Sequence, residues 1–118
     1  MAVTGIGGVF FRAKDPEALT AWYKQHLAVT MVGWEPWQQQ AGPTVFMPFK
    51  ADTDNWPANK PFMINFRVEN LTGMIESLRA AGVEVETRAE WESPEAGSFA
   101  RIHDPEGNPI ELWQPPAE

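Results

Sequence analysis

Apolar residues along the chain recur in two patterns, one typical of short strands and one typical of helices. Apolar and aromatic runs at residues 6–13 and 62–68 predict strands. From Leu71 onward, apolar residues fall at i, i+3, i+4 and i+7, which is the spacing of one helix face. We therefore expect each of these strands to lead into a helix.

Both predicted helices carry start signals. Asp15 is followed by a proline and a glutamate, which supply an N-cap, a residue suited to the first helical position and an acid in the first turn. The first helix should therefore run from about residue 16 to residue 27. Asn70 is the expected N-cap of the second helix, which should end near Ala81 because Gly82 favours a stop.

An internal repeat relates the two halves of the sequence. The dipeptide Phe11-Arg12 recurs as Phe66-Arg67, 55 positions later, and the two N-caps are separated by the same interval. Each copy then continues with further strand material, expected at residues 29–34 and 44–49 in the first copy and at 83–87, 98–103 and 109–113 in the second. The repeat predicts a single domain of two modules, residues 1–57 and residues 58–118.

Two polar stretches separate the predicted strands. Residues 50–60 are polar, contain Asn55-Trp56-Pro57, and are expected to be the linker between the modules. A second loop, residues 89–97, is expected to overhang a pocket.

Composition excludes several classes of protein. The chain has 118 residues, no cysteine and no apolar run near the roughly 20 residues needed to span a membrane, so disulfides, thiolate sites and a membrane partner are not expected. Its net charge of -7 repels phosphate backbones, which argues against nucleic acid. The N-terminus has no basic region or apolar signal core, so we expect a cytoplasmic protein.

Strand alternation places several polar side chains on one face of the predicted sheet. If the apolar alternates face the helices, then Arg12, Asn65, Arg67 and Glu111 face the opposite way. A carboxylate at the centre of an apolar strand is costly unless it has a partner, and Arg67 or Arg12 is the expected one. Such a cluster serves equally as a structural ion pair or as an anchor that orients a ligand.

Aromatic residues supply candidate walls for a pocket. Of the six tryptophans only Trp22 lies on a predicted helix, and the others lie on strands and loops, where binding surfaces are usually found. We expect Trp34, Trp91 and Trp113 to contact a ligand.

The sequence resembles a known superfamily at three places. These are the repeat itself, the start of the first helix, and above all Asp-Pro-Glu-Gly-Asn at 104–108 followed by Ile-Glu-Leu at 110–112. Together they resemble the vicinal oxygen chelate superfamily of glyoxalases, bleomycin-resistance proteins and extradiol dioxygenases. The resemblance implies an α+β fold in which two β-α-β-β-β modules form a cupped, eight-stranded mixed sheet around a ligand cavity, commonly completed in a homodimer. Whether the modules pair within one chain or swap between two stays open.

The resemblance also implies where a metal would bind. Enzymes of this superfamily hold one divalent ion, and their last-strand glutamate matches Glu111. The other ligand positions fall on Gly8, on Met63, and near Phe46 or Met47, which do not suit a hard or borderline divalent ion. We therefore expect no cofactor, and a divalent metal only in a rearranged site with His103.

Several functional hypotheses follow. The first is a metal-independent binder of a small aromatic or amphipathic molecule, with bleomycin-resistance proteins as the precedent. The second is a metal-dependent lyase, isomerase or dioxygenase that uses Glu111 and His103. A metal-free enzyme with Glu111 as general base also stays open. A purely structural or partner-binding domain would be favoured if the fold had no pocket.

Overall fold

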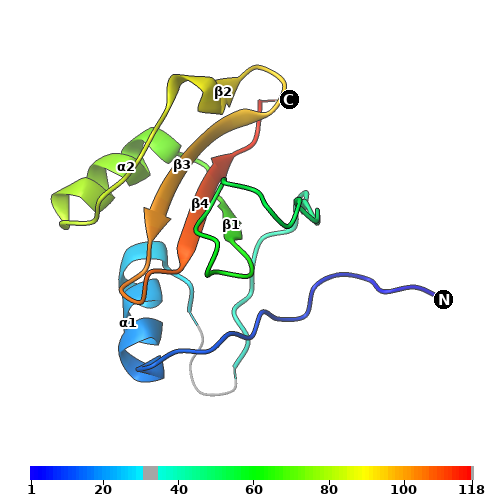
Figure 1. Cartoon of the computed structure of the whole chain (residues 1–118), viewed down its shortest axis with the longest axis vertical. Coiled ribbons are helices and arrows are strands. Elements are labelled where there is room, and N and C mark those ends of the chain that lie inside the picture. The colour runs from blue at the N-terminus through cyan, green and yellow to red at the C-terminus, as the bar shows by residue number, and fades with distance from the viewer. Residues whose placement is uncertain (31–34, 118) are drawn as a thin grey trace.

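The chain folds into one mixed sheet with two helices packed on one face and a long irregular segment on the other (Figure 1). The computed structural model describes residues 1–30 and 35–117. None of the helices in these ranges has the length and hydropathy that a membrane crossing requires. The elements in chain order are α1 (Pro16–Leu27), β1 (Ile64–Arg67), α2 (Leu71–Ala80), the 3-10 helix η1 (Ala89–Trp91), β2 (Glu92–Ser93), β3 (Gly97–His103) and β4 (Pro109–Gln114).

The strands lie in the order β1-β4-β3-β2. β1 runs parallel to β4, whereas β3 is antiparallel to both of its neighbours. The predicted α+β class is confirmed. Within the described ranges this sheet draws only on strands between residues 64 and 114, so the eight-stranded, two-module cup stays a prediction.

The hydrophobic core lies between the helices and the sheet. Ile110 and Leu112 of β4 and Ala100 and Ile102 of β3 are fully buried on the helix side. They meet apolar residues of both helices, namely Leu19, Tyr23, Leu71 and Leu78. The alternation along β4 that the sequence predicts is confirmed, and it leaves Glu111 on the sheet face that points away from the helices.

Side-chain caps fix the starts of both helices. The Asp15 carboxylate accepts a hydrogen bond from the Ala18 N–H at 3.1 Å, and Asn70 Oδ1 accepts one from the Gly73 N–H at 3.0 Å. Each cap satisfies a backbone donor that the helix itself leaves free. The predicted limits of α1 are confirmed, and α2 ends one residue before the expected Ala81.

Three predicted strands of the described chain are absent. Residues 6–13 and 44–49 are extended but belong to no sheet, and residues 83–87 make only one isolated bridge, between Glu86 and Arg101. An apolar run becomes a strand only where a neighbouring backbone completes its hydrogen bonds, and these runs have no such neighbour in the described chain. In the strand predicted at residues 29–34, residues 29–30 are irregular, and residues 31–34 lie outside the described residues.

The turn between β3 and β4 is built around the buried carboxylate of Asp104. Its Oδ1 accepts the backbone N–H groups of Glu106 and Asn108 at 2.9 and 3.0 Å. Its Oδ2 accepts the Asn108 side chain at 2.7 Å and the Tyr23 hydroxyl at 2.8 Å. Four donors therefore compensate the cost of burying this group.

The same turn holds the beginning of α1 against the sheet. The Glu106 carboxylate accepts the backbone N–H groups of Lys14 and Asp15 at 2.6 and 3.0 Å. Together with the bond from Tyr23 to Asp104, these contacts join the start of α1 to the turn between β3 and β4. The Asp-Pro-Glu-Gly-Asn motif thus has a structural role in this chain.

The lone tyrosine of the chain provides a pH test of this junction. Burial raises the pKa of Tyr23 above its usual value near 10, and the hydrogen bond to Asp104 and the charge of Asp104 raise it further. A raised folded pKa contributes stability that is present below pH 10 and is lost as the pH rises above it, at up to about 1.4 kcal/mol per pH unit. We expect no tyrosinate absorbance near 295 nm until the protein unfolds.

Tyr23→Phe is the matched control for this titration, because it removes the ionising hydroxyl and keeps the ring. Above pH 10 its unfolding free energy, measured by urea denaturation, should fall less steeply than that of the wild type. Tyrosinate formation near pH 10 in the folded protein would contradict the proposed junction.

Candidate functional site

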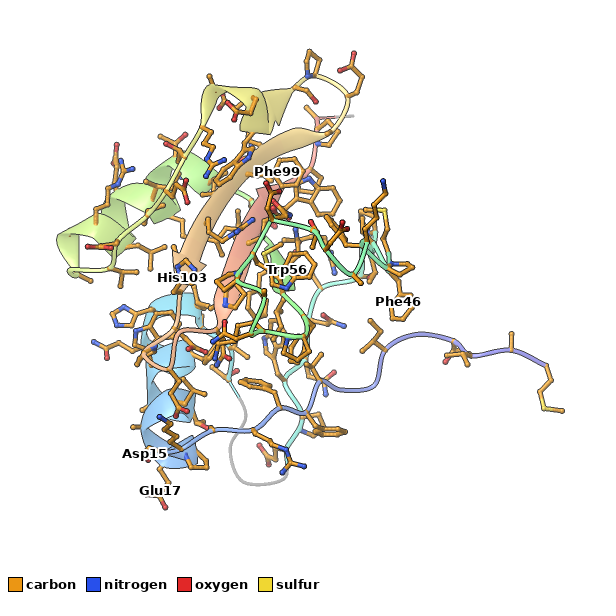
Figure 2. All side chains as sticks on the ribbon, viewed as in Figure 1. Asp15, Glu17, Phe46, Trp56, Phe99 and His103 are labelled. Atoms are coloured by element: carbon orange, nitrogen blue, oxygen red, sulfur yellow. The ribbon has the colours of Figure 1, made fainter. Side chains whose placement is uncertain are left out.

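A cavity of about 1250 Å³ lies between the outer face of the sheet and the segment of residues 43–63. Its volume exceeds the roughly 300–1,000 Å³ of ordinary small-molecule pockets. Figure 2 shows Trp56 and Phe99 over the strands, whereas Phe46 lies on the side remote from the helices. The main aromatic and polar lining residues are Phe49, Trp56, Phe62, Trp91, Phe99, Trp113, Lys50, Asn55, Lys60, Asn65, Glu90, Glu95 and Glu111.

A row of polar side chains crosses the sheet beside this cavity. Asn65 of β1, Glu111 of β4 and Arg101 of β3 are register partners on adjacent strands. Asn65 donates a hydrogen bond from Nδ2 to Glu111 Oε1 at 2.7 Å, and Arg101 Nη2 lies 3.8 Å from Glu111 Oε2. Glu111 is therefore held between an amide donor and a guanidinium cation, as its place in an apolar strand requires.

Arg101 is the buried member of this row, with a relative exposure of only 6%. Its Nη1 donates to the Asn55 carbonyl at 2.7 Å, and its guanidinium carbon lies 5.5 Å from the centre of the Trp91 ring. Among the described residues its Nε has no hydrogen-bond partner. Burial lowers the pKa of Arg101, and the charges of Glu111 and Glu86 act in the opposite direction.

An aromatic row lies beside the polar row. The rings of Phe99 and Trp113 are stacked, with centroids 6.2 Å apart and an interplanar angle of 10°. Trp113 Nε1 donates to the Ala96 carbonyl at 2.7 Å, which fixes the orientation of the indole. The site thus combines two nearly parallel aromatic rings with charged and hydrogen-bonding side chains.

The structure brings together only some of the predicted site residues. Asn65, Glu111, Trp91 and Trp113 all line the cavity. Trp34 lies outside the described residues.

The expected partners of Glu111 are wrong. Arg67 donates instead to the Gln40 carbonyl at 3.1 Å, and neither Arg67 nor Arg12 lines the cavity. Arg12 belongs to the segment that joins no sheet, so strand alternation does not orient its side chain. Arg67 is the register partner of Trp113, two residues further along β4 than Glu111.

Sequence reasoning missed Arg101, which takes the expected place of Arg12 and Arg67. The turn pairs His103 of β3 with Pro109 of β4. Because the strands are antiparallel, the residue two before His103 faces the residue two after Pro109, and Arg101 therefore lies opposite Glu111. Arg101 also lies between the apolar residues Ala100 and Ile102. This alternation could have predicted that its side chain points away from the helices.

The predicted linker forms part of the cavity wall. Asn55 covers the Arg101 guanidinium, and Trp56 is held by a hydrogen bond from its Nε1 to the Lys60 carbonyl at 2.9 Å. The Trp56 ring also meets the Phe49 ring edge-on, with centroids 5.0 Å apart. The expectation that the loop of residues 89–97 borders a pocket is confirmed, because Trp91, Glu95 and Ala96 line it.

Potential metal ligands do not converge in the described part of the chain. No group of three or more histidine, aspartate or glutamate side chains has the arrangement of a metal site there. His103 is exposed and does not line the cavity, whereas Glu111 does. The other histidine, His26, packs beside Trp22 on α1, with ring centroids 5.2 Å apart.

Comparison with known proteins identifies the family. Residues 8–113 match the family described as glyoxalase-like domain. Because the match spans most of the sequence, the chain belongs to this family and thus to the vicinal oxygen chelate superfamily. None of the curated proteins matches the chain.

A solved structure shares the fold. It is described as TnmS3, an antibiotic binding protein from Streptomyces sp. CB03234, and it aligns with a TM-score of 0.65 over 98% of both chains. The two sequences are 22% identical, so this similarity is one of fold.

The ion pair between Arg101 and Glu111 is open to a double-mutant cycle. Removing one partner leaves the other partly buried without its counter-charge, so Arg101→Met and Glu111→Leu should each lower the free energy of unfolding, by roughly 1–4 kcal/mol. The double variant should lose less unfolding free energy than the two single variants lose together, and the difference, a coupling energy measured by urea unfolding, should be roughly 0.5–3 kcal/mol. Losses in the two single variants that add up to the loss in the double variant would contradict the ion pair.

Proposed function

We propose that this protein is a metal-independent binder of a small aromatic or amphipathic molecule, which it holds in the cavity between the sheet and residues 43–63. The observation that carries the proposal is that three tryptophans and the hydrogen-bonded pair of Asn65 and Glu111 line a single cavity. Sites for small molecules are commonly lined by aromatic side chains with few polar groups, which fix the orientation of the ligand.

The aromatic walls favour a flat ligand. Trp56, Trp91 and Trp113 line the cavity, and so does Phe99, whose ring is nearly parallel to that of Trp113. Rings that stack on such side chains gain more than the burial of area alone, by roughly 0.5–1.5 kcal/mol for each pair. TnmS3, which has the same fold, is described as an antibiotic binding protein, and this description supports a small-molecule ligand.

The polar row would supply the specificity. One carboxylate oxygen of Glu111 accepts the hydrogen bond from Asn65, and the other lies near the Arg101 guanidinium. Glu111 also lines the cavity, and its carboxylate has further lone pairs that can accept a hydrogen bond from a ligand. A hydroxyl or amine on the ligand is the group that best suits this carboxylate. Ligands without such a group would leave a polar site unpaired and should bind more weakly.

The working unit in this proposal is a homodimer. One side of the cavity is formed by residues 43–63, a segment with no sheet of its own to support it in the described chain. A second copy would add the missing support.

Titration of tryptophan fluorescence with two planar probes tests the proposal. Anilinonaphthalene sulfonate and an anthracycline, which carries hydroxyl and amine groups, should each give saturable quenching that is unchanged by EDTA. Trp113→Ala should weaken both probes by about tenfold or more, because it removes the stacking surface. Glu111→Gln should weaken the anthracycline more than the sulfonate.

His103→Ala is the control, because this exposed side chain does not line the cavity. Its affinities should match those of the wild type. Quenching that requires an added divalent metal, and that is lost in both Glu111→Gln and His103→Ala, would favour the metal-dependent enzyme instead.

A further inference from the structure

The buried guanidinium of Arg101 contacts three residues that line the cavity, and they come from three separate parts of the chain. Its Nη1 donates to the carbonyl of Asn55 at 2.7 Å, and its carbon lies 5.5 Å from the centre of the Trp91 ring. Its Nη2 lies 3.8 Å from Oε2 of Glu111. All three partners line the cavity, whereas Arg101 itself does not.

The backbone of Arg101 is fixed on both sides of its strand. Its N–H donates to the Glu86 carbonyl and its carbonyl accepts the Glu86 N–H, each at 2.9 Å. On the other side Arg101 is paired with Glu111 of β4. Because both backbone bonds of Arg101 go to Glu86, the pair with Glu111 is of the non-hydrogen-bonded kind, in which side chains lie closer together. The guanidinium is therefore carried by a rigid, interior strand.

Stability alone gives little reason for an arginine at this position. The side chain is 6% exposed, and its Nε has no hydrogen-bond partner in the described part of the chain. A buried ion pair often contributes no more stability than apolar residues of similar size, and an unmatched buried donor adds a further cost. The contacts with the cavity walls supply a reason for the cation that packing does not.

The linker of residues 50–60 is tied to the sheet most closely by this guanidinium. The Asn55 N–H and the Trp56 indole both bond to atoms inside the linker. Lys60 reaches the turn between β3 and β4 at 3.3 and 3.4 Å, whereas the bond from Arg101 to Asn55 is 2.7 Å. Loss of the Arg101 guanidinium should therefore loosen this wall of the cavity.

Two guanidinium groups lie over the ring of Trp91. The Arg88 carbon is 4.9 Å and the Arg101 carbon 5.5 Å from its centre, both within roughly 6 Å, the range of a cation–π contact. Arg88 is exposed, and its Nε donates to the Glu86 carboxylate at 2.8 Å. Because a cation–π contact is stronger where the cation is shielded from water, we expect Arg101 to hold the ring more firmly than Arg88 does.

We infer that Arg101 is a positioning residue of the ligand cavity: its guanidinium holds the linker, Trp91 and Glu111 in one arrangement before a ligand arrives. It does not touch the ligand itself. Walls that are already in place need less ordering when the ligand binds, so this arrangement raises the affinity. The inference rests on the proposed function for its effect on affinity, whereas the arrangement of the walls is a property of the free protein.

Arg101→Lys separates positioning from stability. Lysine keeps a positive charge beside Glu111 but lacks the planar fork that serves several partners at once. Its midpoint of urea unfolding should stay closer to that of the wild type than the midpoint of Arg101→Met, which leaves Glu111 without its counter-charge. Its affinity for the anthracycline, measured by tryptophan fluorescence, should nevertheless fall by roughly tenfold, because Asn55 and Trp91 would then have to be ordered during binding.

Arg79→Met is the matched control for the loss of an arginine. The Arg79 side chain also donates to a backbone carbonyl, that of Val85, at 3.0 Å, but it is exposed on α2 and does not line the cavity. This variant should bind the anthracycline as tightly as the wild type. Wild-type affinity in Arg101→Lys would overturn the inference.

NMR relaxation of the free protein separates this inference from the proposed function. In the wild type the Asn55 amide and the Trp91 indole should have heteronuclear NOE values as high as those of β4. Both values should fall in Arg101→Lys, because the two groups gain fast motion, while that of the Trp22 indole on α1 stays the same. Unchanged values at Asn55 and Trp91 would sink the positioning role, whether or not a probe binds.

A wild type that binds neither probe, with lowered NOE values in Arg101→Lys, contradicts the proposed function. The same result supports the role of Arg101 in arranging the walls. Binding by the wild type, with weaker binding and lowered NOE values in Arg101→Lys, supports both.

Discussion

The hydrogen bonds of Asp104 join the part of the chain before the sheet to the sheet itself. This carboxylate is 4% exposed and is stabilised by four donors, one of which is the Tyr23 hydroxyl of α1. Leaving one of these groups without a partner would cost about 1–3 kcal/mol. Because the same turn also sets the pairing of β3 with β4, it fixes both where α1 packs and which side chains meet on the outer face of the sheet.

The site follows from that pairing. With His103 opposite Pro109, Arg101 lies opposite Glu111, and Asn65 completes the row from the parallel strand. The carboxylate in the middle of an apolar strand is thus accommodated by neighbours on both sides. In the proposed function this row orients a ligand that the tryptophans hold, and a metal is not required.

Local signals in the sequence were sufficient for the helices and for the last hairpin. The cap at Asp15 and the proline after it gave the limits of α1, and alternation gave the faces of β4. These features depend on neighbouring residues in the chain, which the sequence displays directly. The cavity residues Trp91 and Trp113 were found by the same kind of reasoning.

The sequence alone did not predict which distant segments pair as strands. Residues 6–13 have the composition of a strand, but whether they form one depends on a partner backbone, which composition does not specify. Alternation also put Arg12, Arg67 and Glu111 on one face without giving their register. Arg101 was missed for that reason, since only the turn length sets it opposite Glu111.

Chemical shifts of the six indole N–H groups, on titration with the anthracycline, test the central claim of a ligand cavity on the outer face of the sheet. The signals of Trp56, Trp91 and Trp113 should move together, while that of Trp22 on α1 stays in place. Shifts at Trp22 without shifts at the three cavity tryptophans would contradict the account.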